Sequence, residues 1–156
     1  MQYSMTKQME QQKEFNLGYK VSKIDTTRFS YNDIDENQVA VLFENEENLK
    51  VVLDTNMGVS LEKSEIFFEI NTSLLNSENN NNIITHTGKT TFSIINLDST
   101  FDKENENFNL PDAFIVQLYA LSYSHARALL SVELNRTVYK DKFYLPVINP
   151  QRILNK

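Results

Sequence analysis

The chain has 156 residues, a formal net charge of -6 at pH 7 and no cysteine. Its length fits one domain with one hydrophobic core. The lack of cysteine excludes disulfides, thiolate metal sites and cysteine nucleophiles. The acidic balance argues against nucleic-acid binding, because such surfaces cluster Lys and Arg. No apolar run approaches the roughly 20 residues that span a bilayer, so we expect no membrane insertion.

The first residues of the chain differ in composition from the rest. Residues 1–15 are polar and lack the unbroken apolar stretch of a signal peptide. We expect a flexible tail there, followed by one domain over residues 16–156. Without an export signal, the expected location is the cytoplasm.

The first part of the domain has an extended pattern. Leu17 to Phe29 alternates apolar and polar residues and predicts a strand, with a bulge near Ser22 and Lys23. Asn32 to Glu47 mixes acidic residues with a short apolar patch, and we expect a long ordered loop.

Three more strands are predicted in succession. Leu49 to Leu61 places apolar residues on one face by strict alternation, and Glu65 to Leu75 repeats the pattern after a short turn. The Asn-rich run Asn76 to Asn82 predicts a solvated hairpin loop. Ile83 to Leu97 then resumes as a strand. These patterns predict four sequential antiparallel strands.

The periodicity changes after the charged segment Asp98 to Asn109. Pro111 and Asp112 favour a helix start, and apolar spacing continues the helix to about Asn135. A short helical turn follows Pro150. The sequence thus predicts an α+β fold, a four-stranded antiparallel sheet connected as a meander or Greek key, with one long helix and a short C-terminal helix.

The long helix carries two neighbouring apolar stripes. One sheet covers only one of them, so the other predicts oligomerisation through the helix. The second stripe is Ile115, Tyr119, Ala126 and Leu129. The stripe that we expect at the oligomer interface is Phe114, Leu118, Leu121, His125, Ala128 and Val132.

Few residues suggest catalysis or cofactor binding. The three glycines are too widely spaced for a phosphate-binding loop, so no nucleotide cofactor is expected. The two histidines, His86 and His125, are expected to be structural, and no metal site is predicted. Asp54 and Thr55 match part of an aspartic-protease triplet, but Asn56 stands where its tight turn needs glycine. No catalytic residue is assigned.

Several apolar residues lie in predicted loops, where packing does not obviously need them. Each alone could fill a gap in the core, but together they could line a groove. They are Phe43, Phe101, Phe108, Phe143 and Tyr144.

Four short segments, in order, resemble motifs of the SecB chaperone family. Val51 to Thr55 resembles its central hairpin, and Thr91 to Ile94 its Phe-Ser-Ile element. Ser124 to Arg127 is similar to its Pro-Tyr-Ala-Arg motif, although only the Ala and Arg match. Leu145 to Asn149 is similar to its Leu-Ala-Pro-Val-Asn segment. The resemblance extends from about Val21 to the C-terminus.

The resemblance implies an ATP-independent holdase that binds unfolded polypeptide clients in apolar grooves and assembles as a homotetramer, a dimer of dimers. Clients in that family include secretory preproteins and antitoxins. The five loop aromatics are then expected to bind client, with Ile153 and Leu154 as remnants of a lid. The alternative is a small-ligand-binding or enzymatic domain whose curved sheet shelters a pocket.

The resemblance also bears on the SecA motor, which docks partly on an acidic outer sheet surface. Thr85 or His86 stands where the family has a Glu. The chain also ends soon after its last helix begins, without the C-terminal extension of members that engage the motor. Acidic residues at Asp33, Asp35 and Glu36 could replace part of the surface, but exposed ion pairs contribute at most about 1 kcal/mol each. We expect weak SecA binding and a dedicated client.

Overall fold

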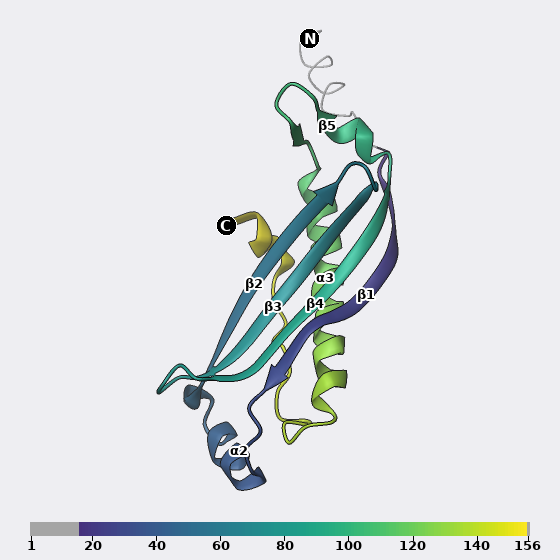
Figure 1. Ribbon diagram of the computed structural model, residues 1–156. Helices are drawn as coiled ribbons and strands as arrows, with labels where there is room; N and C mark the ends of the chain where they lie inside the picture. The colour runs from purple at the N-terminus through teal and green to yellow at the C-terminus, as the bar shows by residue number, and fades with distance from the viewer. Residues whose placement is uncertain (1–15, 156) are drawn as a thin grey trace.

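A computed structural model describes residues 16–155, so the tail predicted over residues 1–15 lies outside the described residues. Four long strands form one antiparallel sheet, and a long helix covers one of its faces (Figure 1). The strands are β1 (Gly18–Tyr31), β2 (Leu49–Ser60), β3 (Glu65–Asn76) and β4 (Asn82–Ile95). This arrangement confirms the predicted α+β fold.

The strand order is β1-β4-β3-β2. Three strands follow one another through hairpins, and β1 lies beside β4, reached through a long connection, which is the Greek-key option of the prediction. The β2–β3 hairpin pairs Ser60 with Glu65, as expected from the turn between them. Both β1 and β2 are edge strands of this sheet, and this leaves one long side of each free to pair.

Strand β1 bends twice. Its register against β4 shifts between Val21 and Lys23, where the bulge was predicted, and again between Thr26 and Arg28, where it was not. Bulges increase local twist and bend the strand. The curved path of β1 around the helix is visible in Figure 1.

The predicted loop from Asn32 to Glu47 contains a helix, α2 (Glu36–Phe43), followed by a 3-10 turn, η1 (Glu46–Asn48). The loop prediction was wrong for these residues because it missed a capping box. The Gln38 N–H donates to Asp35 Oδ1 at 2.9 Å, and the Asp35 N–H donates to Gln38 Oε1 at 3.2 Å. Such reciprocal bonds satisfy N–H groups that a helix start leaves unpaired. Val39, 1% exposed, fixes α2 to the core.

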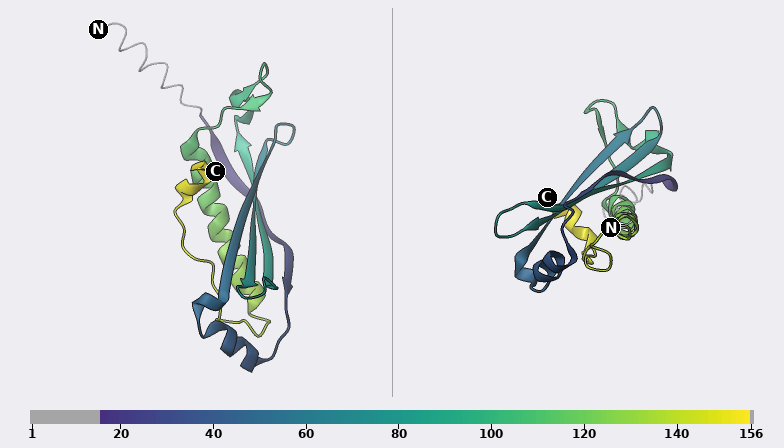
Figure 2. Two further views of the ribbon diagram at one scale, coloured as in Figure 1. Left: turned by 90° about the vertical axis from the view of Figure 1, so that its left-hand side faces the viewer. Right: turned by 60° about the horizontal axis from the view of Figure 1, so that its bottom comes forward.

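Helix α3 (Asp112–Leu134) confirms the predicted long helix and packs mainly on β4, β1 and β3 (Figure 2). It approaches the sheet closely at Gly88. A methyl group added to Gly88 would lie 3.0 Å from Ala126 Cβ and 3.1 Å from Ala126 Cα, so no larger residue fits without moving the helix. None of the helices described over residues 16–155 is long and apolar enough to cross a membrane.

The segment between β4 and α3 is more structured than the charged crossover that was expected. It forms a 3-10 turn, η2 (Leu97–Thr100), and a small hairpin of β5 (Phe101–Asp102) and β6 (Asn107–Phe108). After α3 the chain runs back in extended form beside the helix and ends in a 3-10 helix, η3 (Pro150–Asn155), the predicted C-terminal turn (Figure 1).

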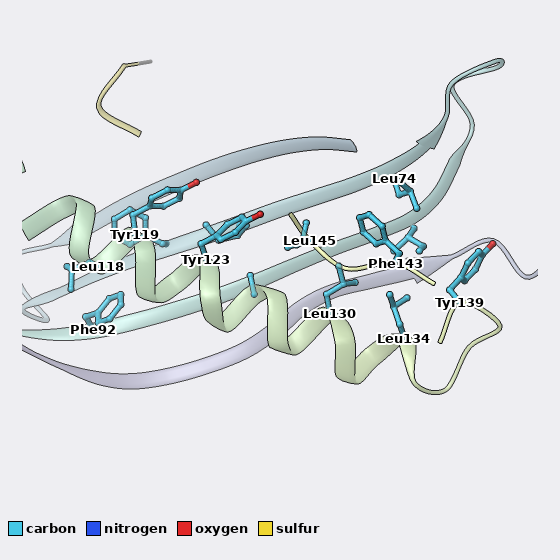
Figure 3. Packing of buried hydrophobic residues seen from close by; sticks show 14 of the residues in the cluster. Leu74, Phe92, Leu118, Tyr119, Tyr123, Leu130, Leu134, Tyr139, Phe143 and Leu145 are labelled. Atoms are coloured by element: carbon cyan, nitrogen blue, oxygen red, sulfur yellow. The ribbon is translucent and has the colours of Figure 1, made fainter. Parts of the chain in front are cut away.

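The core lies between α3, the inner face of the sheet and the extended segment after α3 (Figure 3). Every second residue of β3 points into it, with Ile66, Phe68, Ile70 and Leu74 at most 1% exposed. Phe143 and Leu145, which are 9% and 2% exposed, enter the core from the segment that runs back along α3, residues 143–149, which we call the returning segment. This segment therefore belongs to the core and positions the residues beside it.

Candidate functional site

A pocket of about 780 Å³ lies where α2, the start of β2 and the returning segment meet. We call it the aromatic pocket. Its lining residues come from three stretches of chain that are far apart in sequence. They are Ala40, Phe43, Glu44, Glu46, Leu49, Val51, Leu74, Asp141, Lys142, Phe143, Tyr144 and Pro146.

Each apolar lining residue is placed by its element. Phe43 is the last residue of α2, and its ring lies 6.1 Å from the ring of buried Tyr139. Val51 faces the pocket from β2, paired with Leu74 of β3. Because side chains alternate along a strand, Val51 shares its face of β2 with the other residues of the predicted apolar row.

Two neighbouring aromatics of the returning segment have different environments. Phe143 is 9% exposed and packs into the core, whereas Tyr144 is 58% exposed. The Tyr144 hydroxyl donates to Asp141 Oδ1 at 2.9 Å, and this bond raises the pKa of Tyr144 above its usual value. Phe143 therefore forms a fixed wall of the pocket, and Tyr144 leaves most of its ring accessible to a ligand.

An apolar row continues from the aromatic pocket along β2. On the inner face of that strand, Val51 and Met57 are 39% and 37% exposed, because α3 does not cover the sheet edge. Leu61, just beyond the strand, is 38% exposed. The edge of β2 that faces away from β3 pairs with no other strand of the described sheet. Apolar side chains therefore lie beside a strand edge that pairs with no strand over residues 16–155, a combination that favours pairing with another chain.

The rim of the aromatic pocket is acidic. Glu44, Glu46 and Asp141 lie there, against one cation, Lys142. This charge balance has the same sign as the net charge of the chain. An anionic ligand would meet repulsion at this site, whereas a neutral or cationic one would not.

Two side chains of α3 hold the returning segment in place. The Tyr123 hydroxyl donates to the carbonyl of Pro146, and Arg127 Nε donates to the carbonyl of Leu145 at 3.1 Å. The Ala-Arg pair and the LPVIN segment, two of the family-like motifs, thus meet in space. Burial raises the pKa of the Tyr123 hydroxyl, which stays protonated and can donate.

The structure divides the seven predicted client-binding residues among three places. Phe43, Phe143 and Tyr144 meet in the aromatic pocket. Phe101 and Phe108 lie in the β5–β6 hairpin at the opposite end of the molecule from α2, with ring centroids 5.0 Å apart (Figure 1).

The other two predicted residues belong to η3. Ile153 packs against the core and Leu154 is 37% exposed, and neither lines the aromatic pocket. Sequence reasoning missed the other apolar lining residues: Ala40, Leu49, Val51, Leu74 and Pro146. The alternation of β2 contained the signal for Leu49 and Val51, but not the fact that α3 leaves them uncovered.

The predicted oligomer stripe is only partly available on the surface of α3. Leu118 is 0% exposed and lies wholly in the core of the chain, so it cannot contribute to an interface. Phe114 packs against Tyr19, with ring centroids 5.9 Å apart. His125 Nδ1 is hydrogen bonded to Thr90 Oγ1 at 3.0 Å.

These three side chains face inward because the positions of α3 that pack on the sheet differ from those expected from the sequence. Its buried face is Leu118, Tyr119, Ser122, Tyr123, Ala126, Leu130 and Leu134. Leu121 is half-buried, Ala128 is exposed and Val132 is 60% exposed. Together with exposed Ser124, Ala128 and Val132 form a straight surface row at a spacing of four residues.

The histidines are part of the packing. His86 is fully buried, and burial lowers its pKa to about 4. Its Nε2 is hydrogen bonded to Thr26 Oγ1 at 3.0 Å, and its Nδ1 has no partner among the described residues. Burial also lowers the pKa of His125. Over residues 16–155, no three His, Asp or Glu side chains are grouped so that they could hold a metal ion.

No family model matches the chain, and no curated protein does. Among solved structures, the fold is similar to that of Rv1957 of Mycobacterium tuberculosis, a SecB-like chaperone in complex with a ChAD peptide from the Rv1956 HigA1 antitoxin. The two chains are 13% identical, the likeness covers 84% of this chain and 91% of that one, and the TM-score is 0.46.

Proposed function

We propose that this protein is a holdase chaperone: it binds extended apolar segments of unfolded polypeptides at the aromatic pocket and along the edge of β2. The observation that carries this proposal is an aromatic pocket that opens onto an exposed apolar row at a free sheet edge. Binding and release need no nucleotide in this account. The activity is that of a binding protein and not of an enzyme.

The chemistry of the site fits an unfolded chain. In an extended client, every second side chain points to the same face. When one of these side chains is anchored in the aromatic pocket, the following ones on that face lie along Val51 and Met57 of β2. The edge of β2 pairs with no strand among the described residues, and such an edge offers backbone hydrogen bonds that do not depend on client sequence. Because the anchor needs only an apolar side chain and the backbone bonds need no particular sequence, the site can bind many different client segments.

The returning segment is an internal example of such binding. Over residues 143–149 it makes no strand pairing, yet it buries Phe143 and Leu145 at alternate positions. Its carbonyls are held by Tyr123 and Arg127 side chains. The space beside α3 therefore accepts an irregular apolar chain, and the aromatic pocket lies at the start of that chain, with Phe143 and Tyr144 in its wall.

Assembly and location belong to the same proposal. We propose a cytoplasmic homotetramer, with the surface row of Ser124, Ala128 and Val132 on α3 at a contact between subunits. A dedicated client, such as an antitoxin-like partner, is favoured over general export. On the outer face of β4, Thr85 is half-buried and Lys89 pairs with Glu69 of β3 at 3.5 Å, so the strand itself offers no carboxylate there, which supports weak binding of SecA.

The test is suppression of aggregation of a chemically unfolded protein, without nucleotide, at stoichiometric concentration. Neighbouring valines provide a matched pair, because Val51 is 39% and Val52 is 40% exposed on the same strand, and only Val51 lines the aromatic pocket. Val51→Asp should abolish most of the suppression, since it places a charge where apolar contact is needed. Val52→Asp should retain it. Failure of the unmodified protein to suppress aggregation would refute the proposal.

A further inference from the structure

A second pocket, of about 660 Å³, lies on the other side of α2. Its floor includes the apolar residues Ile34 and Ile83. Its rim is dominated by side-chain amides from α2 and from the Asn-rich loop between β3 and β4. We call it the amide pocket. Four of its amides make no hydrogen bond within the described part of the chain: those of Asn32, Asn37, Asn81 and Asn82.

Helix α2 separates the amide pocket from the aromatic pocket. Asn37 and Val41 line the amide pocket, whereas Ala40 and Phe43 line the aromatic pocket. Residues four or three apart share a face of a helix, so the two pairs belong to two faces of the same short element. A ligand that crosses α2 can therefore contact both pockets.

Hydrogen bonds hold the backbone of the Asn-rich loop in place. Asn80 has a positive φ of 57°, a conformation that Asn tolerates well, and its N–H donates to the Asn76 carbonyl at 2.8 Å. The Ser77 N–H donates to the Asn48 carbonyl at 2.9 Å, which joins the loop to η1. The loop is thus ordered, unlike a simple solvated turn, and less conformational freedom is lost when it binds a ligand.

The lining of the amide pocket excludes several classes of ligand. It has two carboxylates, Asp35 and Glu78, and no Lys or Arg, so phosphates and nucleic acids would be repelled. Its aromatic residue, Tyr139, is 0% exposed and offers no ring face for a sugar to stack on. A side-chain amide has both donors and an acceptor, as does a peptide group. The remaining match is a neutral or cationic stretch of polypeptide.

We propose that the amide pocket binds a polar, uncharged or cationic segment of the same client chain whose apolar anchor occupies the aromatic pocket. This inference rests on the proposed holdase function. A helix with its side chains is about 10 Å across, which an extended chain spans in about three residues. The polar segment should therefore lie about three to six residues from the anchor.

The experiment compares three peptides by calorimetry at physiological salt. All share one aromatic and aliphatic anchor and a short Gly-Ser spacer. One continues with Asn, Gln and Lys, one with Asp and Glu, and one with more Gly-Ser. The Asn-Gln-Lys peptide should bind about fivefold or more tightly than the Gly-Ser peptide, because one retained hydrogen bond contributes about that factor. The Asp-Glu peptide should bind no better than the Gly-Ser peptide.

A double variant, Asn37→Ala with Asn81→Ala, separates this inference from the proposed function. Both side chains are exposed, so the fold should be unaffected. The variant should lose the gain from the Asn-Gln-Lys extension and bind the Gly-Ser peptide as before. Asn56→Ala, at an exposed site on the outer face of β2, should change neither. A gain that persists in the double variant, or no gain at all, would overturn this inference alone. If the unmodified protein binds none of the peptides, the holdase proposal is refuted as well.

Discussion

The close approach of α3 to Gly88 predicts that Gly88→Ala destabilises the protein. The added methyl group would meet Cβ and Cα of Ala126 at 3.0 and 3.1 Å, closer than ordinary van der Waals contact. Because one of these atoms is backbone, the helix or the strand has to shift. Overpacking of this kind costs about 1 to 3 kcal/mol. Replacing a strand glycine recovers about 0.5 to 1 kcal/mol, so we expect a net loss of about 1 to 2 kcal/mol.

Gly18→Ala is the matched control, because Gly18 is also a strand glycine without positive φ. There the new methyl group would meet the flexible end of the Ile95 side chain at 3.2 Å, which can move away. Urea unfolding followed by circular dichroism measures both variants. Gly18→Ala should be neutral or slightly stabilising. A Gly88→Ala variant as stable as the unmodified protein would refute the packing of α3 described above.

Three further predictions concern charge, assembly and the distant hairpin. The free energy of unfolding should fall by about 3 kcal/mol as the pH drops from 6.5 to 4, because the pKa of His86 is about 6.5 in the unfolded chain and about 4 in the folded one. Urea midpoints at several pH values test this. A His86→Leu variant with the same pH dependence would contradict it. Val132→Asp should give smaller species by light scattering. Ile95→Asp should not, because Ile95, which is 63% exposed, lies on another surface. An unchanged size for Val132→Asp would rule out this side of α3 as an interface. Alanine at both Phe101 and Phe108 should lower stability but leave client affinity per folded molecule unchanged, because these rings pair with each other far from the aromatic pocket. A tenfold loss of affinity in a binding titration would show instead that the hairpin contacts client.

A fourth prediction concerns export. Binding of SecA from the same host, measured at physiological salt, should be weak, and submicromolar affinity would contradict it. On the outer face of β4, Thr85 is half-exposed, while His86 points into the core. Of the two residues, Thr85 is therefore the one that lies on that surface. The resemblance to the SecB family implies a Glu there, and the prediction of weak binding rests on its replacement by Thr.

Local patterns were enough to predict most of the fold. The alternation of β2 and β3, the turn between them and the start of α3 all follow from residues close together in sequence. Helix α2 was missed because it is short and its apolar residues, Val39 to Phe43, form one continuous run without helical spacing; the capping pair of Asp35 and Gln38 was its clearest sign. The two stripes of α3 are adjacent, so spacing alone could not tell which of them the sheet covers, and Leu118 was placed on the wrong side for this reason.

The candidate site was less accessible to sequence reasoning. Phe43 and Phe143 are a hundred residues apart, and only the return of the chain along α3 brings them to one pocket. That path depends on side-chain bonds from Tyr123 and Arg127 to carbonyls of the returning segment. Such long-range contacts leave no local periodicity. For the same reason, Phe101 and Phe108 could not be distinguished in advance from the loop aromatics that line the pocket.

The most direct test of the holdase proposal is photo-crosslinking of an unfolded client from two adjacent positions of β2. Benzoylphenylalanine is placed at Val51, which faces the aromatic pocket, or at Val52, which is equally exposed on the opposite face. We expect strong crosslinking of the unfolded client from position 51, little from position 52, and none of the same client once it has folded. Equal crosslinking from both positions, or crosslinking only from position 52, would contradict it.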